Sequence, residues 1–269
     1  MSCRFIYLAF ENLKRSFFKI RFLGTVIGLA FIIAYSGASF SIYGGSYKEA
    51  YTSNDFIIYF LNDYTVTGIF LVVLFTIYLS SVFSDGEINY MYISRLKKKS
   101  DLFKSYILSI FLFACVFLVI TLIGVFIVGG VLSKYHNNWS EFAGVIIKEN
   151  GYGLLSSVYT PWTSIVISIW LLFMMLIIVG LIFYLGYCIS KEIGLPILIQ
   201  SIIIIVSGIV YSFKIDILYR FLPGFNSILL YHDSKSEYPS LEFSLIYILI
   251  LIVVLTGTSY GITRRKLRF

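Results

Sequence analysis

Charged residues are scarce in this chain. They make up 13% of its 269 residues, against roughly 25% in soluble proteins, whereas 59% of the residues are hydrophobic. No Asp, Glu, Lys, Arg or His lies well inside any of the long apolar runs, and Glu242 stands at the edge of one. Ion-driven transporters need such groups near the middle of the membrane, and intramembrane proteases or transferases need paired acids, histidines or an activated nucleophile. The sequence therefore argues against these classes, including an integral membrane enzyme.

Motifs that bind nucleotides or metals, or that form disulfides, are also missing. No Gly-x-x-x-x-Gly-Lys-Ser/Thr loop occurs, so the chain does not bind ATP through a P-loop. His136 has no second ligand at metal-binding spacing, which predicts no metal site. Cys3 falls on the predicted cytosolic side, and Cys115 and Cys188 fall inside apolar runs, so we interpret all three as small apolar side chains. If the protein does ATP-driven work, the energy comes from another subunit.

Six long apolar runs dominate what the sequence does contain, and the mean hydropathy is +0.89. A helix needs about 20 residues to cross the hydrocarbon, and in lipid the backbone must satisfy its own hydrogen bonds. We therefore predict an all-α integral membrane protein, a single transmembrane domain over residues 1–269. The expected spans are 22–42, 66–83, 106–132, 164–189, 195–213 and 243–262.

The basic residues are distributed unevenly along the chain and predict its orientation. With the N-terminus in the cytosol, fifteen of the twenty-one Lys and Arg and five of the fourteen acids fall on the cytosolic side. The positive-inside rule then places both termini inside. The net charge of +7 is thus a topology signal and predicts no nucleic-acid partner; the basic blocks would contact anionic membrane lipids. The bias toward Ile, Lys, Phe and Tyr is typical of an AT-rich bacterial source, which indicates the bacterial cytoplasmic membrane.

Residues 1–20 have the pattern of an amphipathic helix that precedes the first span. At helical spacing, one stripe carries the apolar residues Ile6, Phe10, Leu13, Phe17 and Ile20. Such a helix is expected to lie in the cytosolic interface; the alternative is a cytosolic extension of the first span.

The first span contains Gly24 and Gly28, four residues apart. This small-xxx-small spacing lets another helix approach closely, so both are candidates for dimer packing.

Segment 84–104 is the only long charged stretch between two strongly apolar runs. Its lysines determine the orientation in the membrane. The stretch from Glu87 to Arg95 mixes apolar and charged side chains, and as a helix it would present a compact apolar patch with the Arg95 guanidinium beside it. We predict that this patch binds a soluble partner; the alternative is an ordinary basic loop in the headgroup region. The candidate residues are Glu87, Ile88, Tyr90, Met91, Tyr92, Ile93, Ser94 and Arg95.

Three external segments complete the expected layout. Residues 44–65 are expected to form a short loop, and residues 133–163 a longer one with interfacial aromatic residues. Segment 214–242 holds two apolar pieces, 215–222 and 225–231, that are too short to cross and are separated by Pro223 and Gly224. We expect these pieces to be half-buried helices in the outer interface.

Over essentially its full length, this layout resembles the permease subunits of ABC-2 exporters, in particular the bacitracin-resistance and lantibiotic-immunity kind. The shared features are the amphipathic start, the six spans with both ends inside, the loop 85–104 after the second span and the broken external helices. The resemblance implies that the loop carries a coupling helix that fits a groove on a separate ATPase. It also implies two ATPase subunits that hold ATP and Mg, and a dimer with an identical or sister permease.

The expected function is ATP-driven export of an amphipathic substrate, such as an antimicrobial or signalling peptide, a drug or a lipid, by a subunit that holds no cofactor and is not itself an enzyme. Export of a polysaccharide or lipid-linked substrate, and a non-transporting scaffold or sensor partner, are the alternatives. Polar and aromatic residues in the spans are candidates for the pathway: Thr76, Tyr78, Gln200, Ser201, Ser207 and Tyr211.

Overall fold

A computed structural model describes residues 4–46, 51–83, 99–136, 138–140, 143, 159–232 and 239–266. All regular secondary structure in these ranges is helical. Six helices are long and apolar enough to cross a membrane, and each overlaps one of the expected spans, which confirms the prediction of a multi-pass, all-α protein. They comprise Ile20–Ile42, Thr65–Phe83, Ser100–Leu132, Pro161–Ser190, Gly194–Ser212 and Leu241–Arg265.

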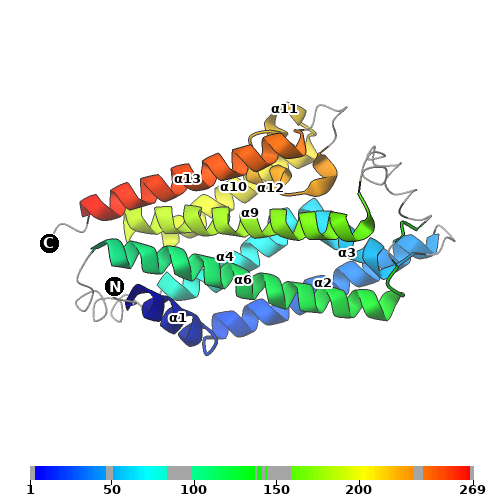
Figure 1. Cartoon of the computed structure of the whole chain (residues 1–269), viewed down its shortest axis with the longest axis horizontal. Coiled ribbons are helices and arrows are strands. Elements are labelled where there is room, and N and C mark those ends of the chain that lie inside the picture. The colour runs from blue at the N-terminus through cyan, green and yellow to red at the C-terminus, as the bar shows by residue number, and fades with distance from the viewer. Residues whose placement is uncertain are drawn as a thin grey trace.

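The spanning helices form an elongated bundle with both chain termini at the same end (Figure 1). We call this end the terminal end and the other the distal end. Helix α9 packs against α13, α10, α3, α6 and α4, so it lies at the centre of the bundle. The spanning elements are α2 (Ile20–Ser46), η1 (Thr65–Phe70, a π-helix) with α4 (Leu71–Phe83), α6 (Lys99–Leu132), α9 (Pro161–Ser190), α10 (Gly194–Ser212) and α13 (Leu241–Lys266).

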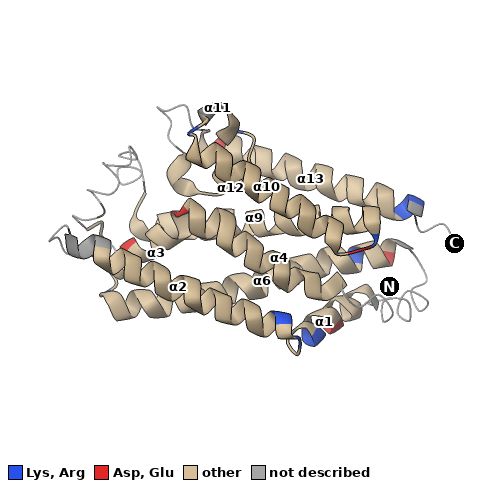
Figure 2. Cartoon of the chain, turned by 180° about the vertical axis from the view of Figure 1, so that it is seen from behind, with Lys and Arg blue, Asp and Glu red and all other residues tan. Residues whose placement is uncertain are grey.

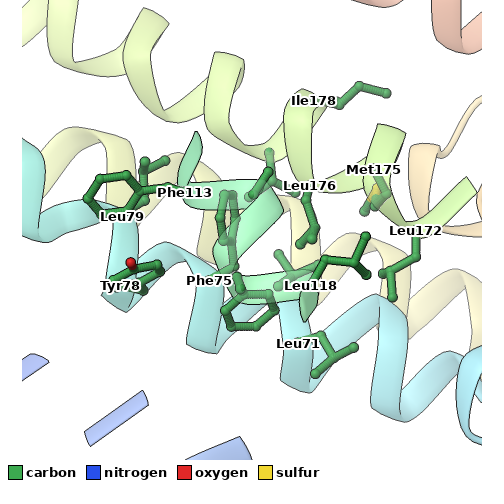
Figure 3. Close-up of a cluster of buried hydrophobic side chains, with 14 of the residues drawn as sticks. Leu71, Phe75, Tyr78, Leu79, Phe113, Leu118, Leu172, Met175, Leu176 and Ile178 are labelled. Atoms are coloured by element: carbon green, nitrogen blue, oxygen red, sulfur yellow. The ribbon is translucent and has the colours of Figure 1, made fainter. Parts of the chain in front are cut away.

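Among the described residues, charged side chains gather toward the ends of the bundle (Figure 2), and most of the side chains buried between the helices are apolar. In its middle, the side chains of α4, α6 and α9 interlock, and Phe75 meets Phe117 edge to face at 5.3 Å between ring centroids. Burial of such side chains keeps the three helices together by close packing. Figure 3 shows this core with Leu71, Phe75, Tyr78, Leu79, Phe113, Leu118, Leu172, Met175, Leu176 and Ile178 labelled.

Helix α1 (Arg4–Ser16) packs against α6 and α4 at the terminal end. Its buried face carries Leu8 and Ala9 together with Ser16. The sequence pattern placed the apolar stripe elsewhere: Ile6 and Phe10 from that stripe are exposed, whereas Leu8, which does not belong to it, is buried. The stripe is therefore not the face that packs on the protein. Small and medium side chains form the intramolecular face because they let α1 approach α6 and α4 closely.

The expectation of a simple loop over residues 44–65 is wrong. The structure has a buried helix there, α3 (Ser53–Asn62). Thr52 and Asp55 form a capping box that satisfies the first N–H groups of α3. Ser53 and Asn54 donate to the carbonyls of Ser133 and His136, so polar residues that look like loop residues are paired inside the protein.

The described part of segment 214–242, residues 214–232 and 239–242, contains three short helical pieces where two were expected. They are α11 (Asp216–Tyr219), α12 (Pro223–Asn226) and the 3₁₀ turn η2 (Leu229–Tyr231). Pro223 begins α12, a position where its missing N–H leaves no bond unmade. The Asn226 amide donates to the carbonyls of Tyr219, Arg220 and Leu222 and accepts a 2.6 Å bond from Ser244. This side chain fastens the short pieces to α13.

Candidate functional site

The predicted coupling residues, Glu87 to Arg95, lie in segment 84–98, outside the described residues. The structure does describe the two points where this segment leaves and rejoins the bundle. It leaves after Phe83, the last residue of α4, and rejoins at Lys99, the first residue of α6. Any partner that acts on the segment acts on the rest of the protein through these two flanks.

Phe83, at the first flank, is held in a cluster of aromatic rings. Its ring is stacked on Tyr106 of α6 at 5.2 Å with 17° between the planes. It also lies 5.3 Å from Phe183 and 4.7 Å from Tyr187 of α9, measured between ring centroids. Phe83 is 2% exposed. Aromatic pairs at these separations add to the packing energy, so the end of α4 is fixed to α6 and α9.

The backbone at the same flank is held by two basic residues. Lys19 Nζ donates to the carbonyl of Ser81 at 2.5 Å, and Arg21 Nη1 donates to the carbonyl of Ser80 at 2.9 Å. The last carbonyls of a helix have no partner within it and carry partial negative charge. Two cations therefore cap the end of α4: Lys19 from the turn before α2 and Arg21 from the first turn of α2.

The second flank, the start of α6, is held by α1. The Asn12 amide donates to Ser109 Oγ at 3.2 Å, and Lys104 Nζ lies 5.9 Å from the centroid of the Phe5 ring. On its other side α1 meets α4, where Ser16 Oγ approaches the Tyr78 hydroxyl at 3.5 Å. Residues 5–21 thus touch both flanks of segment 84–98, and this arrangement is the candidate coupling site.

The six candidate pathway residues do not form one site. Gln200 and Ser207 of α10 line a small cavity with Gly68, Val179 and Gly224. Inside it, Gln200 Nε2 donates to the carbonyl of Val179 at 2.8 Å.

The other four candidates lie elsewhere. Ser201 is exposed on the outer face of α10, and Thr76 is buried with its hydroxyl on the carbonyl of Val72. Tyr78 packs against Phe113 at 4.5 Å between ring centroids. Of the predicted set, the structure therefore brings together Gln200 and Ser207, with Tyr211 at the distal end of the same helix.

Beside the cavity, next to Gly68 and Gly224 of its lining, lies Tyr64, a residue that was not selected from the sequence. Its ring is stacked between Tyr211 and Phe225, each at 4.6 Å between centroids. Burial raises the pKa of Tyr64 to about 12, opposed in part by the nearby Ser207 hydroxyl. A Cβ at Gly68 would lie 2.7 Å from the Tyr64 ring, so glycine is required for this stack. The four-residue spacing of Tyr64 and Gly68 was the available signal.

The two glycines of the first span have different surroundings. A Cβ on Gly28 would lie 2.8 Å from Leu74, so this glycine lets α2 approach α4 within the same chain. A Cβ on Gly24 would have no neighbour within 4 Å, and Gly24 is exposed. Gly28 is thus already used in an intramolecular contact, and a role of Gly24 in dimer packing stays a prediction.

Among the described residues, no group of three His, Cys, Asp or Glu side chains is placed to hold a metal ion. Cys115 and Cys188 carry free thiols. The site is therefore built from aromatic packing and from cations on helix carbonyls.

Comparison with protein-family models, with curated proteins and with solved structures finds no significant match to this chain.

Proposed function

We propose that this chain is the membrane subunit of an ATP-driven exporter of the ABC-2 type in a bacterial cytoplasmic membrane. Both termini face the cytosol, segment 84–98 carries the coupling helix, and ATP and Mg bind to two copies of a separate ATPase subunit. A second permease, identical or a sister chain, completes the transporter. One observation carries the proposal: Lys19 and Arg21 bond to the end of α4 on one side of segment 84–98, and α1 contacts the first turns of α6 on the other.

The anchored flanks make this segment a suitable point for receiving force. The Phe83 cluster joins α4 to α6 and α9, and Phe103 in α6 extends it to Tyr260 of α13 at 5.2 Å between ring centroids. Closely packed side chains transmit displacement rather than absorb it. A partner that moves segment 84–98 would therefore move several spanning helices together, as alternating access requires.

The cavity at Gln200 and Ser207 is where we place part of the substrate pathway. Its lining is mostly apolar with two polar side chains, the chemistry that an amphipathic substrate, such as an antimicrobial or signalling peptide, a drug or a lipid, would need. Its volume of about 20 Å³ has room for about one water molecule, so α9 and α10 would have to separate here to admit such a substrate. The stack of Tyr64 with Tyr211 and Phe225 lies next to Gly68 and Gly224, two residues of this lining. Only 22% of the α10 span and 17% of the α13 span is buried within the chain, which leaves faces for lipid or a second permease.

Co-purification tests the proposal directly. The chain, solubilised from its source membrane, is expected to carry an ATPase, and the double variant Arg95→Glu with Met91→Asp should lose that partner and its ATP turnover. The matched control replaces Lys97 and Lys98 with Gln and should keep both, because these lysines are assigned to topology. If no ATPase co-purifies and the double variant changes neither binding nor turnover, the chain is a scaffold or sensor rather than an exporter subunit.

A further inference from the structure

The face of α1 that points away from the bundle is unusually rich in exposed aromatic rings. Tyr7 is 66% exposed, Phe10 53% and Phe18 85%. Lys14, also exposed, follows Phe10 by one helical turn, and Phe17 is exposed beyond it. We call Tyr7, Phe10, Lys14, Phe17 and Phe18 the outward strip.

The outward strip continues into the exposed face of the first span. Ile20 is 85% exposed, and it is followed along α2 by the exposed residues Leu23, Ile27 and Phe31. Exposed apolar residues of a spanning helix contact hydrocarbon wherever no second permease covers them, as one would at Gly24 on this face. Because the outward strip is continuous with this exposed face of α2, it lies at the level of the bilayer surface. A soluble partner on the strip would have to share it with lipid, so continuity favours the bilayer as the occupant.

Charge points to the kind of lipid. Residues 4–21 contain five basic residues and one acid, Glu11. Lys19 and Arg21 are engaged with the carbonyls of α4, and Arg15 Nε lies 3.0 Å from Glu11 Oε1. Lys14, which points outward between aromatic rings, is the cation best placed to reach a lipid phosphate. Each Lys or Arg near an anionic membrane surface strengthens binding by about fivefold.

We propose that the outward strip is a binding surface for anionic phospholipid headgroups. Lys14 contacts the phosphate through its flexible stem, and the rings of Tyr7, Phe10 and Phe18 lie at the boundary between headgroups and acyl chains. The opposite face of α1 contacts α4 at Tyr78 and α6 at Ser109, so lipid on the strip presses this helix against the two helices that flank segment 84–98. Lipid composition then regulates how firmly these flanks are held. The inference does not depend on the export function.

Hydrogen exchange on the full-length chain in lipid nanodiscs tests this surface. The two lipid mixtures are phosphatidylcholine alone and phosphatidylcholine with phosphatidylglycerol. Backbone amides of residues 4–16 should exchange about fivefold more slowly with phosphatidylglycerol, the factor expected for one cation. Lys14→Gln should remove this difference. Lys191→Gln, which removes an exposed lysine from the α9–α10 turn, should keep it.

Three results would overturn the proposal. The exchange rates could be equal in both lipid mixtures, or Lys191→Gln could act as strongly as Lys14→Gln, which would mean that only overall charge matters. A slowing that requires an added protein partner or a second copy of the chain would assign the strip to that protein.

A spin label on Phe18→Cys provides a second readout, in a background in which the three native cysteines are removed by Cys3→Ser, Cys115→Ala and Cys188→Ser. The label should collide more often with oxygen, which dissolves in lipid, than with a water-soluble nickel chelate. The reverse ratio would place Phe18 in water and contradict the proposal.

Discussion

The guanidinium of Arg21 donates a 2.9 Å hydrogen bond to the backbone carbonyl of Ser80. The two residues belong to different spanning helices, α2 and α4, and the bond sits at the point where the chain leaves the bundle for segment 84–98. Lys19 repeats the arrangement on the next carbonyl, that of Ser81. The last turn of α4 thus depends on side chains from the start of α2 to satisfy its backbone.

Removal of the Arg21 charge should loosen the last turn of α4. Arg21→Gln loses a charge-assisted hydrogen bond to a helix C-terminus, which is worth about 1–2 kcal/mol in a partly buried setting. We expect faster hydrogen exchange at residues 79–83 and a small loss of thermal stability. Arg264→Gln, which changes an exposed arginine near the C-terminus, is the matched control and should leave both unchanged. Equal exchange in the two variants would show that Arg21 does not hold α4.

A methyl group at Gly68 should disrupt the aromatic stack around Tyr64. The added Cβ would lie 2.7 Å from the Tyr64 ring, and overpacking of this kind costs about 1–3 kcal/mol. Gly68→Ala should therefore lower the thermal unfolding midpoint. Gly208→Ala is the control, because a Cβ there has no neighbour within 4 Å and alanine favours helix. Unfolding at the same temperature in both variants would contradict the close contact.

Asn226 should be essential for the short helices of segment 214–242. Asn226→Asp keeps the shape but removes the amide that donates to three carbonyls, and unsatisfied buried groups cost about 1–3 kcal/mol each. We expect faster exchange across residues 218–230 and a lower unfolding midpoint. The same change at the exposed Asn138 should have little effect. Unaltered exchange in Asn226→Asp would mean that the segment is held by apolar packing alone.

His232 should make stability depend on pH. Burial lowers its pKa from 6.5 to about 4, and its Nδ1 lies 3.2 Å from the carbonyl of Leu229. Between these pH values the unfolded chain binds more protons than the folded one, so stability should fall as the pH drops from about 6.5 to about 4. Thermal unfolding measured across this range should show the fall.

The pH effect has a matched control in the second histidine. His232→Gln should flatten the curve between these pH values, whereas His136→Gln, at an exposed position, should leave it as in the parent chain. If both variants keep the full pH dependence, other groups are responsible for it.

The spanning helices were predictable from sequence because hydropathy is a local property and each run is long enough to cross. Helix α3 was not, because Ser53 and Asn54 look like loop residues until the carbonyls of Ser133 and His136 are brought beside them. Those partners are about eighty residues away in the chain. Sequence pattern alone cannot bring them together.

The candidate coupling site and the cavity at Gln200 were also only partly predictable from the sequence. Periodicity indicated that residues 1–20 form a helix. It did not indicate that Leu8 and Ala9 form the packing face, because that depends on the surfaces of α4 and α6 that α1 contacts. Gln200 and Ser207 were found because polar residues stand out in an apolar span. Tyr64 was missed because its importance comes from rings contributed by other elements, Tyr211 and Phe225.

The contact between Asn12 and Ser109 has a consequence for how the protein is made. The two residues are 97 positions apart, so α1 leaves the ribosome long before the helix that it packs against. Until α4 and α6 are both inserted, the protein surface that covers Leu8 and Ala9 is incomplete. During synthesis we therefore expect α1 to lie on the membrane surface until its partner helices are inserted. Although α1 is made first, its packing against the bundle is among the later steps of assembly.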